Sequence, residues 1–291
     1  MEDKKDYKVV FDNIVEDLRQ YVIKNKLKSM VLGISGGIDS TVCAAICHEV
    51  SKKTGIPLIG RSLTIKNKED ETSTAKLVGE AFCNEFEDFK LIGLFHYVAD
   101  TLRFFEQDNY KEKWTNPIAD GNIQARLRMI YLYHLAGITN GFVIDSDNKT
   151  ENLLGFWTIC GDVGDYKPIG NLWKTEVYGL AKYLEEKYKY NHDMKVVAVN
   201  QSIGLTPTDG LGISSSDLEQ IGANSYEEVD EILKGLLASF GEQHSNIDSV
   251  IKSFKDGYNG SIDKDVVDKV CERYRKSNFK RLPKPIAKIK L

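Results

Sequence analysis

A short stretch near the start of the chain combines small residues and one carboxylate in an order that suits phosphate chemistry. It follows an apolar run and precedes a helix-like segment at 41–52, so it predicts a turn from a strand into a helix N-terminus. In that arrangement backbone N–H groups converge on a phosphate. Asp39 would repel the phosphate unless a cation lay between them, so the turn indicates a nucleotide bound with Mg²⁺. The residues of the turn are Gly33, Ile34, Ser35, Gly36, Gly37, Ile38, Asp39 and Ser40.

The turn is not the common P-loop, because no Gly-Lys-Ser or Gly-Lys-Thr closes it. The alternative interpretation is an ordinary strand-to-helix turn that happens to be rich in small residues. Further polar segments downstream favour a site. The segment 145–152 follows an apolar run directly, and 161–165 is a turn with two more carboxylates. Lys174 lies where a helix is expected to begin, a position that the helix dipole disfavours for a cation. It therefore indicates a nearby phosphate, with an exposed lysine as the alternative.

The apolar pattern predicts the elements that must hold these residues. Short apolar runs predict strands at 30–34, 58–65, 89–94 and 141–145, and periodic segments predict helices at 7–26, 68–86 and 123–136. Strands that alternate with such helices indicate an α/β fold, a Rossmann-like parallel sheet with helices on both faces. Ligands in these folds bind at the carboxyl ends of the strands, where both the turn and the segment after Ile144 fall.

The last third of the chain is predicted to differ from the rest. No strand pattern is found after Val196, and the Gly-, Pro- and Ser-rich segment 205–217 predicts a mobile loop. Helices are expected at 225–239 and 263–276. We therefore expect a single domain over 1–291, with an α/β nucleotide-binding core at 1–195. The remainder, 196–291, is expected to be the mobile loop followed by a helical, basic extension.

Composition limits the classes of function. The chain has 291 residues, of which 42% are apolar and 28% charged, with a net charge of −4. This balance is typical of a globular protein and argues against nucleic acid as a partner. We expect no membrane partner, since no apolar run is long enough to span a bilayer. The five cysteines form no Cys-x-x-Cys pair, and the charged N-terminal residues lead to no secretory signal, so we expect a reduced, cytoplasmic protein. The basic tail from Arg273 suits an anionic small molecule, although a solvated end is the alternative.

These motifs carry a resemblance to a known family. The turn resembles the pyrophosphate-binding loop of the ATP pyrophosphatases, the PP-loop superfamily, whose fold is adenine nucleotide alpha hydrolase-like. Further segments, in order along the chain, resemble the successive motifs of ammonia-dependent NAD⁺ synthetase: 121–129, 147–151, 161–166, 174–177 and 273–280. The resemblance implies a ligase that amidates deamido-NAD (nicotinate adenine dinucleotide) to NAD⁺. ATP is its co-substrate, an acyl-adenylate its intermediate, and AMP and pyrophosphate its other products.

The resemblance also implies roles for single residues. Asp39 and Glu151 would bind Mg²⁺, and Asp39 and Lys174 would be catalytic. ATP would be bound by the turn from Gly33 to Ser40 together with Ser146, Lys174 and Thr208, with Arg61 as a weaker candidate. Deamido-NAD would be bound by Arg126, Asp165 and Lys280. The loop that holds Thr208 would order over the substrates and exclude water.

Some positions depart from the family pattern, and the resemblance has further implications. Ile159 replaces a common lysine, Phe279 replaces a histidine, and Ile38 replaces a glutamine. Because the turn begins at Gly33, we expect no glutaminase domain before it and free ammonia as the nitrogen donor. The family works as a homodimer, so we expect a homodimer here. Two alternatives remain open at this point: a tRNA-modifying ATP pyrophosphatase, and a catalytically silent nucleotide-binding regulator.

Overall fold

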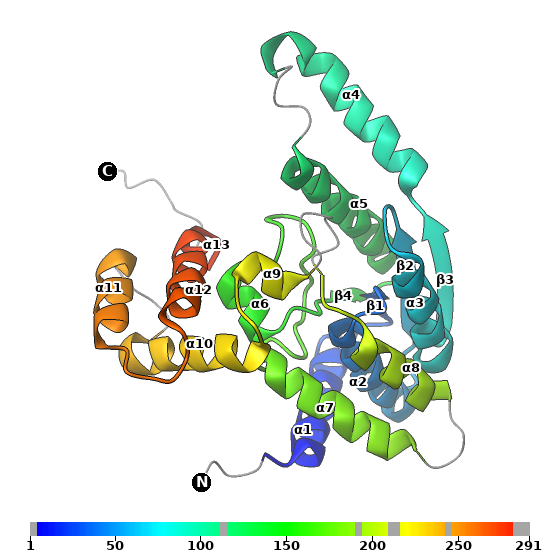
Figure 1. The fold of residues 1–291 in the computed structure, drawn as a ribbon. Helices are drawn as coiled ribbons and strands as arrows, with labels where there is room; N and C mark the ends of the chain where they lie inside the picture. The colour runs from blue at the N-terminus through cyan, green and yellow to red at the C-terminus, as the bar shows by residue number, and fades with distance from the viewer. Residues whose placement is uncertain (1–4, 111–115, 190–193, 209–215, 242–245, 282–291) are drawn as a thin grey trace, which may run out of the picture.

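Four parallel strands form the centre of the molecule (Figure 1). The computed structural model describes residues 5–110, 116–189, 194–208, 216–241 and 246–281. The strands are β1 (Met30–Gly33), β2 (Leu58–Thr64), β3 (Glu85–Lys90) and β4 (Phe142–Ile144), in the spatial order β3-β2-β1-β4. All three neighbouring pairs are parallel, so the carboxyl ends of the strands meet at one edge.

Helices cover both faces of the sheet, which confirms the predicted fold class. Side chains alternate between faces along each strand: Leu32 packs into one apolar cluster and Val31 into another. One face is covered by α1 (Tyr7–Lys24), α2 (Ile38–Thr54), α3 (Glu69–Phe82), α7 (Lys174–Tyr188) and α8 (Met194–Gly204). The other face is covered by α5 (Pro117–Ile138), through side chains such as Leu132.

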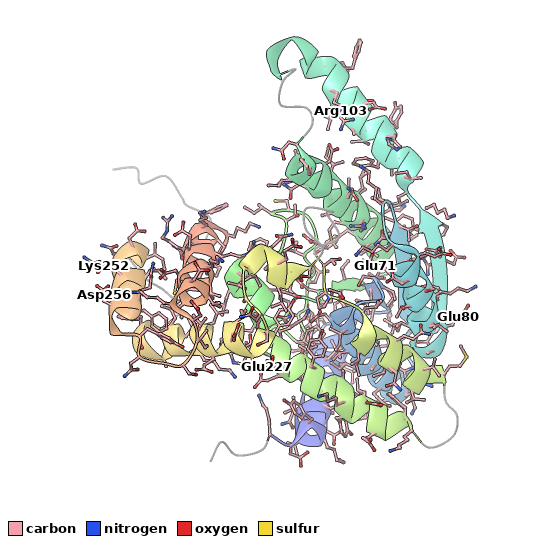
Figure 2. The ribbon with its side chains drawn as sticks, viewed as in Figure 1. Glu71, Glu80, Arg103, Glu227, Lys252 and Asp256 are labelled. Atoms are coloured by element: carbon pink, nitrogen blue, oxygen red, sulfur yellow. The ribbon has the colours of Figure 1, made fainter. Side chains whose placement is uncertain are left out.

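The C-terminal helices have an apolar cluster of their own. It joins buried residues of α6 (Lys149–Leu154), α9 (Asp217–Ile221), α10 (Tyr226–Phe240), α11 (Ile247–Gly257) and α12 (Lys264–Lys276). Helix α6 begins shortly after β4, so the cluster is anchored directly to the edge of the sheet where the site is expected. A short last helix, α13 (Asn278–Arg281), follows α12. In Figure 2 Lys252 and Asp256 mark the outer surface of α11, and Glu227 marks the start of α10 near α7.

Several element predictions need correction. The third strand is Glu85–Lys90 rather than 89–94, because the acidic residues around Phe86 and Phe89 hide the alternation of an edge strand. The third helix ends at Phe82, four residues before its predicted end at 86. Helix α5 begins at Pro117, where Asn116 caps it, rather than at 123. Six of the described helices were not predicted from the sequence: α4 (Ile92–Tyr110), α6, α8, α9, α11 and α13.

The first half of helix α4 packs against α5 through the buried side chains of Phe95 and Ala99, and its far end projects outward (Figure 1). Arg103, labelled on this helix in Figure 2, pairs with Asp120 of α5 at 3.0 Å. Large side chains on α4 are exposed, among them Tyr97, Phe104 and Phe105. Within the described residues, no helix is both long and apolar enough to cross a bilayer. Of the segment predicted as a mobile loop, 209–215 lies outside the described residues.

Candidate active site

A cavity of about 750 Å³ opens at the carboxyl ends of the strands. The glycine turn forms one wall, and the segment after β4 forms another. Residues from α5 and from the C-terminal helices, such as Arg126 and Lys280, complete it. The predicted site residues that line it are Gly33, Ile34, Ser35, Gly37, Ile38, Asp39, Ser40, Arg61, Arg126, Ser146, Glu151, Lys174, Thr208 and Lys280. One connected space therefore reaches motifs that are far apart in sequence.

The glycine turn packs so closely against α3 that position 36 has no room for a side chain. Gly36 has φ +87, and a Cβ at this position would lie 2.5 Å from the carbonyl oxygen of Glu71. Helix α2 begins immediately after Gly37, and no side chain caps its N-terminus. The hydroxyls of Ser35 and Ser40 lie 3.0 Å apart across the turn. Uncapped N–H groups at a helix N-terminus beside a cavity form a favourable place for phosphate oxygens.

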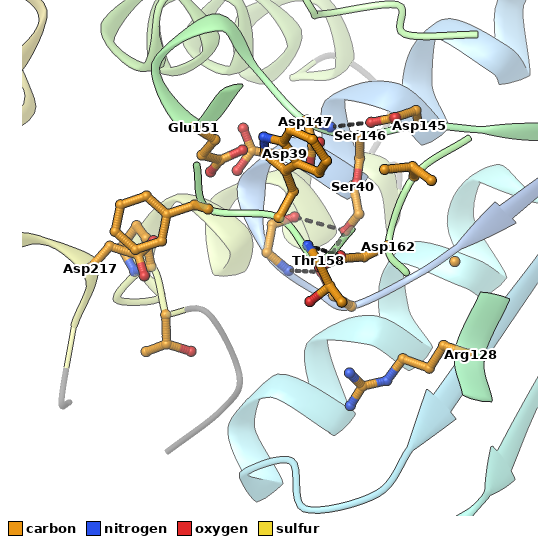
Figure 3. A pocket seen from close by; sticks show the side chains of 18 of the residues that line it. Asp39, Ser40, Arg128, Asp145, Ser146, Asp147, Glu151, Thr158, Asp162 and Asp217 are labelled. Carbon is orange, nitrogen blue, oxygen red and sulfur yellow. Dashed lines mark hydrogen bonds between the residues drawn. The ribbon is translucent and has the colours of Figure 1, made fainter. Parts of the chain in front are cut away.

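A buried lysine joins two carboxylates at the edge of this turn. Lys174 Nζ lies 2.5 Å from Asp39 Oδ2 and 2.8 Å from Glu151 Oε1. Asp39 comes from the first turn of α2, Glu151 from α6, and Lys174 from the first residue of α7. The lysine is 1% exposed, so the alternative of an exposed lysine is wrong. Figure 3 shows Asp39 and Glu151 close together, with Asp147 and Ser146 beside them.

Burial and the neighbouring charges shift the pKa values of Glu151 and Lys174. Burial and then the charge of Asp39 raise the pKa of Glu151 to about 7. Burial favours neutral Lys174, but the charges of Asp39 and Glu151 outweigh it and raise the pKa of Lys174 well above its ordinary value. A pair of carboxylates that repel each other attracts a cation. Lys174 supplies one positive charge to this pair.

The sequence around Glu151 explains its orientation. Asn148 is the N-cap of α6, and its side chain accepts a hydrogen bond from the Glu151 N–H at 3.0 Å. Glu151 Oε2 accepts in return from the Asn148 N–H at 3.3 Å, which completes a capping box. The Asn148 amide also donates to Asp39 Oδ1 at 2.8 Å. Asn148 was not predicted as a site residue, although an Asn three residues before a Glu is a visible capping signal.

The other predicted ATP residues lie at separate places in the cavity. Ser146 lies two residues after the end of β4 and lines the wall beside Asp147. Thr208 donates to Glu71 Oε1 at 3.3 Å, so the end of the described loop reaches the start of α3. Arg61 is buried in β2, where it pairs with Glu85 and donates to the Gly60 carbonyl.

The residues predicted to bind deamido-NAD are not all brought to the cavity. Arg126 lines it and donates to the Ile159 carbonyl at 3.1 Å. Lys280 lines it too, and its ammonium donates to the carbonyls of Gly155, at 2.7 Å, and Trp157. Asp165 does not line the cavity. Its carboxylate accepts from the Val143 N–H at 2.9 Å and from the Tyr133 hydroxyl at 3.1 Å.

The two main departures from the family pattern both face the cavity. Ile159 is 39% exposed and Phe279 is 64% exposed, and both line its wall. Arg128 is a cavity residue that the sequence did not single out. It donates to the Leu63 carbonyl at 3.0 Å and to Asn67 at 3.2 Å, so it joins α5 to the end of β2. Figure 3 shows it apart from the carboxylates. Its position in the ARLRM segment gave no signal that separates it from Arg126.

The comparisons with known proteins agree with this arrangement. A family model described as NAD synthase matches residues 10–284. The chain belongs to this family. An NH(3)-dependent NAD(+) synthetase from Fusobacterium nucleatum is 30% identical over 284 residues, which cover 97% of this chain and 96% of that protein. One from Methanocaldococcus jannaschii is 32% identical over 228 residues, which cover 77% of this chain and 80% of that protein.

Solved structures share the fold of the NAD synthase family. A structure named NMN synthetase, from Francisella tularensis, superposes with a TM-score of 0.75 at 25% identity and covers 98% of this chain and 100% of that one. An NH3-dependent NAD synthetase from Campylobacter jejuni superposes with a TM-score of 0.66 at 24% identity, with 98% and 100% covered. Family membership confirms the predicted resemblance, the enzyme class and the predicted ATP-dependent synthesis of NAD⁺. Neither of the two alternative functions is favoured.

Proposed function

We propose that this NAD synthase family member amidates deamido-NAD with ammonia at the expense of ATP. An oxygen of the pyridine carboxylate attacks the α-phosphorus of ATP, the bond to pyrophosphate breaks, and an acyl-adenylate forms. Ammonia then attacks the acyl carbon, and AMP leaves. The observation that carries the proposal is the placement of Lys174, Asp39 and Glu151 beside the uncapped N-terminus of α2.

The carboxylate pair fits Mg²⁺. Mg²⁺ in nucleotide sites is bound through one or two carboxylates together with phosphate oxygens. Asp39 and Glu151, from different elements, would hold the ion. When bound, it neutralises charge on the ATP phosphates and on the departing pyrophosphate. Lys174 supplies one positive charge against two carboxylates, so the cluster can accept a further cation.

The chain itself contributes positioning and charge rather than proton transfer in the first step. Ser35, Ser40 and the first residues of α2 line the cavity where phosphate oxygens would lie, and no side chain caps the N-terminus of α2. Lys174 sits at the same place with its charge fixed by two carboxylates. Preorganised donors of this kind stabilise charge that develops on a leaving group without reorganisation during the reaction.

Deamido-NAD would occupy the remaining part of the cavity, with Arg126 and Lys280 as its cationic contacts. Asp165 lies outside that cavity, next to Tyr133 on the exposed side of α5. We propose a homodimer in which a second copy extends the site to this face. The exposed side chains of Phe104 and Phe105 on α4 support such an interface. Sedimentation should give the mass of two chains, and a monomer at assay concentrations would contradict this part.

The C-terminal helices are proposed to work with the α/β core as one catalytic domain, because Lys280 reaches the cavity that the strands open. We also propose that the reaction takes place in the cytoplasm. All five cysteines are free, which supports a reducing compartment.

One observation gives a second candidate acceptor to compare with deamido-NAD. The Francisella tularensis structure that superposes with a TM-score of 0.75 is named NMN synthetase. The same chemistry applied to nicotinate mononucleotide would give NMN, and a smaller acceptor would need fewer contacts than deamido-NAD.

One assay tests the proposal and separates the acceptors. The protein, Mg-ATP and an ammonium salt are supplied with deamido-NAD or with nicotinate mononucleotide, and NAD⁺ or NMN is measured. We expect a higher kcat/KM with deamido-NAD. A higher kcat/KM with nicotinate mononucleotide would make it the acceptor in place of deamido-NAD, with the same amidation chemistry. No amide product from either acceptor would overturn the proposed function.

A further inference from the structure

Asp230 of α10 is a buried carboxylate that no prediction assigned to the site. Its side chain is 1% exposed, yet three hydrogen bonds from two other helices converge on it. Oδ1 accepts from the Thr150 hydroxyl at 2.5 Å. Oδ2 accepts from the Thr175 N–H at 3.0 Å and from the Thr175 hydroxyl at 2.8 Å. A buried carboxylate is costly unless it is hydrogen-bonded, so this arrangement is specific.

Helix α7 needs a group of this kind. Its N-cap is Trp173, whose side chain makes no capping hydrogen bond, and its first residue is the cation Lys174. A tryptophan cannot accept from backbone N–H groups, and a cation in the first turn opposes the helix dipole. Asp230 provides the missing acceptor and a negative charge from another part of the chain. In effect α10 caps α7.

The same carboxylate also reaches the helix that carries Glu151. Thr150 precedes Glu151 in α6, and its hydroxyl donates to Asp230 while accepting the Lys174 N–H at 2.9 Å. Thr175 follows Lys174 directly in α7. The chain neighbours of Glu151 and Lys174, namely Thr150 and Thr175, are therefore both hydrogen-bonded to the Asp230 carboxylate.

We propose that Asp230 is a positioning residue that fixes Lys174 and Glu151 in register for Mg-ATP. The inference rests on the proposed function of the cluster. Asp230 does not line the cavity, so it acts through the Thr150 and Thr175 hydroxyls. The C-terminal helices thereby set the positions of Lys174 and Glu151 on one side of the site, and the glycine turn of the core forms the other side.

The simplest competing role for Asp230 is to hold α10 against α7. Other contacts already join the two helices: the Tyr226 ring of α10 lies 6.5 Å from the Tyr178 ring of α7, and Trp173 at the start of α7 packs against the C-terminal cluster. A purely structural role would lower stability and affect both substrates alike. A positioning role would affect the ATP side selectively.

The test compares Asp230→Asn with Asp263→Asn. Asp263 caps α12 by accepting the Asp265 N–H at 2.7 Å, and it lies in the same helical part of the chain but outside the cavity. An amide at 230 keeps the shape and cannot accept all three donors. We expect kcat/KM for Mg-ATP to fall by about 10- to 100-fold in Asp230→Asn, as for groups that orient metal ligands. KM for deamido-NAD should stay unchanged, and Asp263→Asn should keep the kinetics of the wild type.

Substitutions at Thr175 keep the test decisive if Asp230→Asn fails to fold. Thr175→Ser retains the hydroxyl and should keep activity, whereas Thr175→Val should lower kcat/KM for Mg-ATP. The double variant Asp230→Asn/Thr175→Val should lose no more than Asp230→Asn alone, because the two groups act as one unit. Equal kinetic losses in Asp230→Asn and Asp263→Asn, or equal activity of the two Thr175 variants, would overturn the inference.

Failure of the proposed function is distinguishable from failure of this inference. If the wild type makes no amide product, the proposed function is wrong. Affinity for Mg-ATP, measured by titration calorimetry, then tests Asp230 directly. Weaker binding in Asp230→Asn than in Asp263→Asn would support its positioning role, and equal binding would contradict it.

Discussion

Two lysines near the cavity each lie between two carboxylates, but their surroundings differ. Lys174 is 1% exposed and joins Asp39 and Glu151. Lys167 is one-third exposed and joins Asp145 and Asp147, at 3.1 and 2.9 Å. Both clusters follow strands of the same sheet. The residue types alone do not tell them apart.

The hydrogen bonds of the carboxylates separate the two clusters. Asp145 is occupied by the chain itself, since it accepts from the N–H groups of Gly164 and Asp147 at 3.0 and 2.9 Å. It closes the loop between β4 and the turn that follows. In the Lys174 cluster Asp39 lies in the first turn of a helix that no side chain caps. Carboxylates of both clusters line the cavity, but only the Lys174 cluster includes a residue of the uncapped first turn of α2, where phosphates would bind.

The largest expected effect comes from Asp39. Asp39→Ala removes one proposed Mg²⁺ ligand and one partner of Lys174. We expect kcat to fall on the order of 10²-fold or more, the size found when a preorganised electrostatic group is lost. Steady-state rates of NAD⁺ formation at saturating Mg²⁺ measure the change. Near-normal turnover would contradict the assignment of Asp39 as a Mg²⁺ ligand. The Lys174 and Lys167 clusters would then not differ in their effect on catalysis.

The pH dependence tests the Lys174 cluster without disrupting it. The pKa of Glu151 is raised to about 7 by burial and by Asp39. A raised carboxyl pKa means that Glu151 is protonated below pH 7, where it no longer holds Lys174 or a metal ion. The kcat/KM for ATP should fall about tenfold per pH unit below that value. Glu151→Gln should abolish this acidic limb. A limb that persists in Glu151→Gln would assign it to another group.

The same shift fixes the sign of the stability effect. Between the ordinary carboxyl pKa and about 7 the folded state binds more protons at Glu151 than the unfolded state. The free energy of unfolding should therefore decrease as pH rises through this window, and Glu151→Gln should weaken that decrease. Chemical denaturation at several pH values measures it. The raised pKa of Glu151 would be contradicted if the free energy of unfolding rose with pH in this window in the wild type but not in Glu151→Gln.

A third lysine of the cavity differs from both clusters, because the partners of Lys280 are carbonyl groups. Burial lowers its pKa. Lys280→Ala should raise KM for deamido-NAD about tenfold, the size of one charged hydrogen bond, and leave KM for ATP nearly unchanged. Initial rates with each substrate varied in turn measure the difference. Equal changes in both KM values would contradict a specific contact between Lys280 and deamido-NAD.

The smallest kinetic effect is expected at Lys167. Lys167→Met leaves Asp145 with its backbone donors but exposes it to the repulsion of Asp147. We expect the free energy of unfolding to fall by about 1–3 kcal/mol and kcat to change far less than in Asp39→Ala. Denaturation curves and rates on the same preparation give both numbers. A loss of kcat as large as that of Asp39→Ala would make the two clusters functionally alike.

Local patterns predicted the sheet and the turn because these features are encoded in short segments. The apolar run before Gly33 and the glycines after it determine β1 and the entry into α2. The C-terminal helices at 225–239 and 263–276 were predicted from their periodicity and are confirmed to within one residue at their starts and ends. Edge strand β3 was misplaced because one of its faces is solvated and acidic.

What the sequence did not reveal depends on contacts between distant segments. Nothing near Lys174 indicates that it is buried between carboxylates from α2 and α6, and the spacing alone left an exposed lysine as open. Asp230 gave no signal, since its partners Thr150 and Thr175 lie in other motifs. Asp165 sits outside the cavity because its carboxylate binds the backbone of β4, which no local pattern shows.

The central claim is that the Lys174 cluster and the glycine turn promote transfer of the AMP group from ATP to the carboxylate of deamido-NAD. Exchange of labelled pyrophosphate into ATP, measured without ammonia, tests this step directly. We predict exchange in the wild type only when deamido-NAD is present, and its loss in Asp39→Ala. Exchange that does not require deamido-NAD, or that survives in Asp39→Ala, would contradict the account.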